Sequence, residues 1–209
     1  MKIGLIGLAG AGKDTVADML IKVLDGYTID RYAKPLKVAA KTIFGDSFDD
    51  RDVKEATVDV DPDTVIEASF KALQSCKLTF EENDKASELF FDHLGFKDRL
   101  SPREYQQVLG TEVGRATRST IWSDRLTKSK RKLIIPDVRF VSELVDYNIL
   151  ITRHPVSKGS VHPSELLATE MQLGLDESYD YVIFNNSSLE HLQAEVNHLV
   201  NHLKNRGDL

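Results

Sequence analysis

The sequence predicts an α/β fold in which a central parallel sheet of about five strands is flanked by helices. Three observations support this. Short apolar runs alternate with longer segments of helical periodicity, a glycine-rich segment joins the first run to the first helix, and polar clusters follow the ends of the runs. In a parallel sheet these ends share one edge, where ligands bind. A chain of 209 residues can form such a fold as one domain.

Five apolar runs are predicted to be strands: residues 3–6, 27–29, 132–136, 148–152 and 181–184.

The helices follow from apolar spacing and from start and stop residues. Apolar residues from Val16 to Leu24 predict a first helix that Gly26 ends, and the next is expected over 36–44. Ser101, Pro102 and Glu104 form a helix start, with a capping box, for a helix that runs to Ala116. Further helices are expected over 121–130 and 140–147. A final helix, capped at residues 187–190, is expected to carry apolar residues from Leu189 to Leu203 on one face.

We expect residues 1–209 to be a single domain with two additions. Residues 46–100 are predicted to be a helical insertion with an acidic start and helices near 62–75 and 81–94. Residues 154–178 are polar, contain two prolines, and are predicted to be a lid-like segment. The insertion is rich in large apolar residues, which either form a homodimer face or pack on the core: Phe70, Leu73, Phe90, Phe91 and Leu94.

Composition narrows the class of protein. Cys76 is the one cysteine, so no intrachain disulfide can form and a reducing, cytoplasmic compartment is expected (the host cytoplasm if the source is viral). The net charge of −6 argues against general binding to nucleic acid or to anionic membranes. No apolar run approaches the roughly 18 residues that span a bilayer.

The segment from Gly7 to Thr15 has the pattern of a phosphate-binding loop, G-x-x-x-x-G-K. Glycines let backbone N–H groups turn toward phosphate oxygens, and the following helix directs its positive end to the same place. The strand before the loop and the amphipathic helix after it are the context that this motif requires. A plain glycine-rich turn is the alternative.

Asp14 departs from the pattern, which usually has Ser or Thr after the lysine, where a hydroxyl binds Mg²⁺. A carboxylate can bind the metal directly or through water, or it can favour the helix dipole from the first turn.

Several segments, in order along the chain, together resemble the bacteriophage deoxynucleoside monophosphate kinases, which have a P-loop kinase fold. These are Gly-Lys-Asp-Thr from Gly12, Ala-Lys-Pro-Leu-Lys from Ala33, Gln-Val-Leu-Gly-Thr-Glu from Gln107, Pro-Asp-Val-Arg from Pro136, Arg153 with His-Pro-Ser-Glu from His162, and Ile-Phe-Asn-Asn-Ser-Ser-Leu-Glu from Ile183. The resemblance covers 46–100 poorly. It implies transfer of the γ-phosphoryl group of ATP to a deoxynucleoside monophosphate, with Mg²⁺ as cofactor and small nucleotides as partners.

The resemblance and the predicted fold together assign candidate roles. The ATP phosphates would be held by Ala9, Gly10, Ala11, Gly12, Lys13, Asp14 and Thr15. The catalytic candidates are Lys13, Asp137, Arg139 and Arg153, and the metal candidates are Asp14 and Asp137. Lys158 would close over ATP with the lid, and Asn185 and Asn186 would lie near the adenine. The acceptor candidates are Arg31, Lys37, Lys54, Gln107, Thr111, Arg115, Trp122 and Arg139.

Each role has a structural alternative. Arg139 could be a surface arginine paired with Asp137 or Glu143, and Asp137 could cap a helix. Trp122 could stack on a base or pack in the core. Asn185 and Asn186 could form a turn and a helix cap.

Other functions stay open. A phosphomonoester kinase of the phosphomevalonate kinase type would have a similar loop, and a nucleotide-binding switch or ATPase would turn over ATP without an acceptor. Residues 101–132 carry eight bases against three acids, which could also contact DNA, although no DNA-binding motif accompanies them.

Overall fold

The computed structural model describes residues 1–50, 52–153 and 165–209 and divides the chain into two compact units. The first unit is Met1–Tyr32 with Leu126–Leu209, and the second is Ala33–Arg125. The helices expected in the insertion over 46–100 belong to the second unit, which also includes 33–45 and 101–125.

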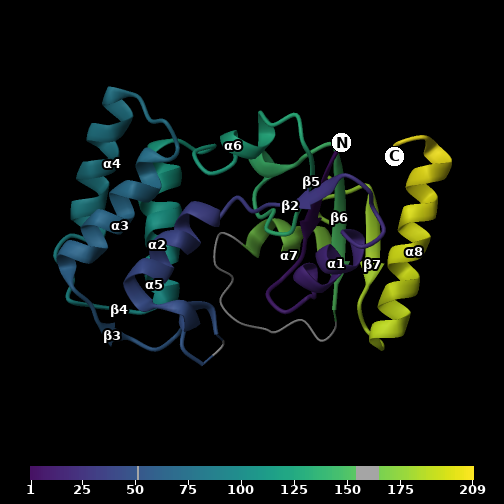
Figure 1. The fold of residues 1–209 in the computed structure, drawn as a ribbon, viewed down its shortest axis with the longest axis horizontal. Helices are drawn as coiled ribbons and strands as arrows, with labels where there is room; N and C mark the ends of the chain where they lie inside the picture. Colours follow the sequence, from purple (N-terminus) through teal and green to yellow (C-terminus); the bar gives the residue numbers. More distant parts are fainter. Residues whose placement is uncertain (51, 154–164) are drawn as a thin grey trace. The chain divides into compact units, whose positions relative to one another are not determined.

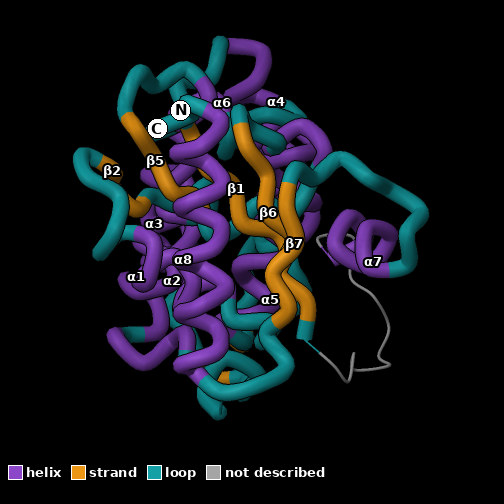
Figure 2. Tube along the Cα trace, turned by 90° about the vertical axis from the view of Figure 1, so that its right-hand side faces the viewer, coloured by secondary structure: helices purple, strands orange, loops and turns teal. Residues whose placement is uncertain are grey.

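The first unit contains the predicted sheet. Its five strands are β1 (Lys2–Ile6), β2 (Tyr27–Ile29), β5 (Lys132–Ile135), β6 (Tyr147–Thr152) and β7 (Tyr181–Phe184). The sheet is seen in Figure 1, and Figure 2 labels its strands in the order β2-β5-β1-β6-β7. All five are parallel, so the prediction of about five parallel strands is confirmed. Because β1 lies between β5 and β6, the loop after it opens at the centre of the sheet, where the strand order reverses.

Helices α1 (Lys13–Leu20) and α8 (Leu189–Arg206) cover the sheet and contact each other (Figure 2). Their apolar residues join inward side chains of the strands in one core, which includes Val16, Leu20, Val196 and Leu199. Leu189, expected on the apolar face of the last helix, is 63% exposed. Ser188 caps this helix by accepting a hydrogen bond from the N–H of His191. Helix α7 (Leu166–Gln172) contacts β6 and lies in the expected lid-like segment, of which 154–164 is outside the described residues.

The second unit is helical. It contains α2 (Lys34–Phe44), the 3-10 helix η1 (Asp46–Asp49), α3 (Pro62–Gln74), α4 (Phe80–His93), α5 (Pro102–Gln107) and the π-helix η2 (Val108–Arg115), with a small antiparallel pair formed by β3 (Val58–Asp59) and β4 (Arg99–Leu100).

Side-chain caps define the starts of three of these helices. Asp61 accepts from the N–H of Thr64, Thr79 forms a capping box with Glu82, and Ser101 accepts from the N–H of Glu104.

Of the large apolar residues of the insertion, Leu73, Phe90 and Leu94 are buried, and Phe70 stacks edge-on against Phe90. Phe91 is 45% exposed.

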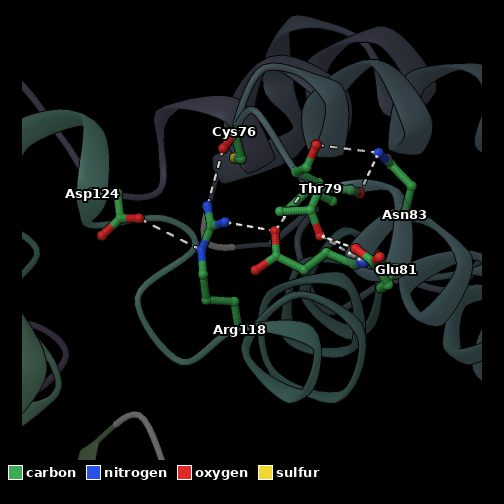
Figure 3. A network of polar contacts seen from close by, with 8 residues as sticks. Cys76, Thr79, Glu81, Asn83, Arg118 and Asp124 are labelled. Atoms are coloured by element: carbon green, nitrogen blue, oxygen red, sulfur yellow. Dashed lines mark hydrogen bonds and ion pairs between the residues drawn. The ribbon is translucent and has the colours of Figure 1, made fainter.

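A network centred on Arg118 holds the turn between α3 and α4 within the second unit (Figure 3). One guanidinium nitrogen donates to Glu82 at 2.7 Å, a second donates to the carbonyl of Cys76 at 3.0 Å, and Nε lies 3.5 Å from the carboxylate of Asp124. Two of these three partners are carboxylates, so the charge of Arg118 is compensated within the second unit.

Three helix predictions are corrected. The helix expected from Ser101 to Ala116 changes to π geometry at Val108. The helix expected over 121–130 is reduced to α6 (Asp124–Thr127), preceded by turns. The helix expected over 140–147 is reduced to the short 3-10 turn η3 (Val141–Glu143). Glu143 is held at both ends, because its carbonyl accepts from the Tyr32 hydroxyl and its carboxylate accepts from the N–H of Arg139.

Candidate active site

The phosphate loop follows β1 and packs closely against its neighbours. At Gly7 an added Cβ would lie 2.6 Å from the carbonyl oxygen of Ile151, so the loop can leave β1 along this path only with a glycine. Gly12 precedes α1 with φ +99°, in the left-handed region that glycine adopts without strain. Ala9 and Gly10 are exposed, whereas Ala11 is buried.

Lys13 lies folded over this loop. Its ammonium group donates to the carbonyls of Gly7 at 2.7 Å and Leu8 at 2.9 Å. Burial, and after it the positive charge of Arg139, lowers the pKa of Lys13 to about 8, while the charges of Asp14, Glu165 and Asp137 act in the opposite direction. A cation that is costly to keep charged gains most from an incoming anion, so Lys13 is suited to receive a phosphate group.

Asp14 extends from the first turn of α1 and is exposed. Its carboxylate contacts the guanidinium of Arg31, which follows β2, at 2.6 Å. The acid that replaces the usual hydroxyl therefore pairs with a predicted acceptor-binding arginine. Thr15, the next residue, is half-buried.

Asp137 follows β5 and connects it to the segment after β2. One carboxylate oxygen accepts a hydrogen bond from the N–H of Tyr32 at 3.0 Å. The N–H of Arg139 donates to the carboxylate of Glu143 at 2.8 Å. Glu143 is 1% exposed and fixes the backbone of Arg139, whose own side chain is exposed.

Arg153 and Asn185 complete the site from β6 and β7. The guanidinium of Arg153 lies 3.5 Å from the carbonyl of Gly10, at the limit of a hydrogen bond. The side-chain amide of Asn185 donates to the carbonyl of Ala11 at 2.8 Å, and Asn186 beside it is exposed. Lys158, predicted to close over ATP, lies outside the described residues.

The structure thus brings the predicted phosphate-side residues to one edge of the sheet, since each follows the carboxyl end of a parallel strand or lies in the loop after β1. Three residues with a part in this site were missed: Tyr32, Glu143 and Glu165. The signal for Glu143 was its spacing of four residues from Arg139, which had suggested only a surface ion pair.

The metal candidates Asp14 and Asp137 both act electrostatically on Lys13, so both lie near the phosphate loop. Within the described residues, no three or more His, Cys, Asp and Glu side chains form a group that could hold a metal. Mg²⁺ commonly takes one or two carboxylates together with water and substrate phosphates, so Asp14 and Asp137 keep their role as metal candidates only together with a bound nucleotide.

The acceptor candidates of the second unit are held in different ways. Lys37 forms an ion pair with Asp49 at 2.5 Å, and Arg115 donates to the carbonyl of Ser119 at 3.2 Å. Lys54, Gln107 and Thr111 are half-buried.

Trp122 is 2% exposed, and its indole N–H donates to the carbonyl of Gly110 at 2.8 Å. Its ring lies so close to Gly114 that an added Cβ there would be 2.4 Å away. This geometry favours the packing alternative for Trp122 over stacking on a base.

Within residues 1–50, 52–153 and 165–209, none of the helices combines the length and the apolar character that crossing a bilayer requires.

No family model matches the chain. Among curated proteins, the chain is similar to one from Acanthamoeba polyphaga mimivirus named "Putative deoxynucleotide monophosphate kinase". The two are 28% identical over 202 residues, which cover 93% of each chain.

Proposed function

We propose that the protein is a nucleotide kinase that transfers the γ-phosphoryl group of ATP to deoxynucleoside monophosphates, giving ADP and deoxynucleoside diphosphates. One observation carries the proposal: a glycine-rich loop with Lys13 and the arginines Arg31, Arg139 and Arg153 occupy one edge of a parallel sheet. The mimivirus relative, similar over nearly the whole chain, supports nucleotide kinase activity at this coarser level.

Phosphoryl transfer depends on holding two phosphates in line and neutralising their charge. The loop backbone from Ala9 to Thr15 would bind the ATP phosphates. Lys13 would leave the carbonyls of Gly7 and Leu8 for the β- and γ-phosphates. Arg139, with its backbone fixed by Glu143, would bind the acceptor phosphate or the transferring group.

The remaining site residues would shape and close the site. Arg31 is a second candidate for the acceptor phosphate, and it would have to share its contact with Asp14. Arg153 and Lys158 would cover the ATP phosphates and exclude water, which otherwise hydrolyses ATP. Asp14 and Asp137 would hold Mg²⁺, which when bound supplies charge neutralisation for the phosphates.

The acceptor needs no general base, since its attacking oxygen belongs to an anionic phosphate. Lys37, Lys54, Gln107, Thr111 and Arg115 are the candidates for contacts with the acceptor in the second unit. The burial of Trp122 leaves its ring with little surface for a base.

The test is ADP release from purified protein with ATP and Mg²⁺ and with each of dAMP, dCMP, dGMP, dTMP, their ribose counterparts, phosphomevalonate, or no acceptor. Release that depends on deoxynucleoside monophosphates is the expected result. The Lys13→Ala variant, purified in the same way, is the control, because loss of ADP release in this variant excludes a contaminating kinase. Release that is equal with and without acceptor would contradict the proposal and indicate an ATPase or a switch. Release with phosphomevalonate alone would reassign the substrate.

A further inference from the structure

Asn185 touches the phosphate loop from outside it. Its side-chain nitrogen lies 2.8 Å from the carbonyl oxygen of Ala11. A carbonyl only accepts hydrogen bonds, so the amide must present its N–H₂ group to the loop. The amide oxygen of Asn185 cannot occupy this position, because it is itself an acceptor and would face the oxygen of Ala11.

The backbone of Asn185 is fixed as well. Its N–H donates to the carbonyl of Thr152 at 2.8 Å, which attaches the residue to the end of β6 just after β7 ends. The amide therefore reaches the loop from a residue that is tied to two strands of the sheet. A residue held in this way loses little conformational entropy when a ligand binds.

The loop is shaped to accept this amide. A Cβ on Gly12 would lie 2.4 Å from the Asn185 side-chain nitrogen, well inside van der Waals contact. The glycine thus serves two purposes, because it adopts φ +99° and it leaves room for Asn185.

This contact differs from the others at the loop carbonyls. Lys13 binds the carbonyls of Gly7 and Leu8 with the same ammonium group that is proposed to bind phosphate, so these bonds would break when ATP binds. The Asn185–Ala11 bond uses no group that the phosphates need. It can hold the loop with and without ligand, so that its N–H groups already face the phosphate site.

We infer that Asn185 is a positioning residue for the phosphate loop, and that it acts on the polyphosphate of ATP through Ala11 rather than contacting the adenine. The inference rests on the proposed phosphate site. It replaces the adenine role that the sequence suggested for Asn185 and leaves Asn186 as the candidate at the base.

The test compares two probes, ATP and inorganic tripolyphosphate, each with Mg²⁺, by titration calorimetry on the full chain. Asn185→Ala removes the donor, and Asn185→Asp keeps the shape but places a negative charge against the Ala11 carbonyl. We expect Asn185→Ala to lower the binding affinity for both probes by the same factor, about tenfold, and Asn185→Asp to lower both affinities further. In the kinase assay, KM for ATP rises while KM for the acceptor and the melting temperature stay near wild type.

The matched controls are Asn201→Ala and Asn201→Asp on the exposed face of α8, which should bind both probes as wild type does. Weaker ATP binding with unchanged tripolyphosphate binding would overturn the inference and return Asn185 to the nucleoside. Unchanged binding of both probes would also overturn it. A lower melting temperature together with equal increases in KM for ATP and KM for the acceptor would overturn it as well, because it would show a general structural role for Asn185. If wild type binds neither probe, the proposed phosphate site itself fails.

Discussion

Lys13 and Arg118 are both half-buried cations, but their partners differ in kind. Arg118 binds a carboxylate, a carbonyl and a second carboxylate, all supplied by the second unit (Figure 3). Lys13 binds two loop carbonyls, and burial together with the charge of Arg139 lowers its pKa. A buried cation with a carboxylate partner has its charge compensated in the fold, whereas one held by carbonyls alone can still gain from an anion. Partner type therefore separates a structural cation from a ligand-binding one.

The largest effect should come from Lys13→Ala. Because the cation that faces the phosphates is lost, kcat/KM for ATP in the acceptor-dependent assay should fall roughly 1,000-fold. The melting temperature should not fall, since no carboxylate is left unpaired. A variant that keeps more than a tenth of wild-type activity would remove the contrast with Arg118.

Arg118→Ala should show the reverse behaviour. Loss of the guanidinium removes one of two hydrogen-bond donors to the Glu82 carboxylate and the donor to the Cys76 carbonyl, so the free energy of unfolding in urea should fall by about 2 kcal/mol. ATP binding to the folded protein should stay within about twofold of wild type. The matched control is Arg99→Ala, because Arg99 pairs with Asp59 at 3.3 Å and both side chains are largely exposed, and it should cost less than about 1 kcal/mol. Equal losses in the two variants would show that the Arg118 network contributes no more than a surface pair.

A pH titration of ATP binding tests the charge on Lys13 directly. With a pKa of about 8, free Lys13 is mostly protonated at pH 7 and mostly neutral at pH 9, and only the protonated form attracts phosphate. ATP affinity should therefore be about tenfold weaker at pH 9 than at pH 7. Arg139→Gln removes a nearby positive charge, so it should raise the pKa of Lys13 and move the midpoint upward. A midpoint that stays in place would show that the two cations do not interact.

The smallest effect concerns acid stability in the second unit. The backbone N–H of Thr79, and after it Arg118, hold the pKa of Glu82 below its ordinary value of 4.5. This carboxylate therefore contributes stability above pH 4.5 that is lost as the pH falls through its folded pKa. Glu82→Gln should be less stable than wild type by about 1 kcal/mol at pH 7, with a smaller difference at pH 3. Urea unfolding at the two pH values measures this, and a difference that does not shrink would exclude the carboxylate as its source.

Local sequence was sufficient for the elements whose signal lies within a few residues. The five strands, the paired helices of the insertion and the Ser101 cap follow from apolar runs, periodicity and capping residues, and they occur close to the predicted positions. Local sequence was not sufficient at 121–130 and 140–147, where contacts beyond the neighbouring turn of the chain hold the backbone. Tyr32 binds the Glu143 carbonyl across 111 positions of sequence, and the Trp122 ring fills the space beside Gly114.

The sequence by itself determined which chemical groups reach the functional edge, because a parallel sheet places the residue after each strand on the same side. The tertiary structure alone decided how these groups pair. Asp14 binds Arg31, Asp137 binds the Tyr32 N–H across 105 positions, and Asn185 binds Ala11 across 174. A hydrogen bond depends on the distance and angle between two groups in space, and the order of residues along the chain does not specify these for groups so far apart.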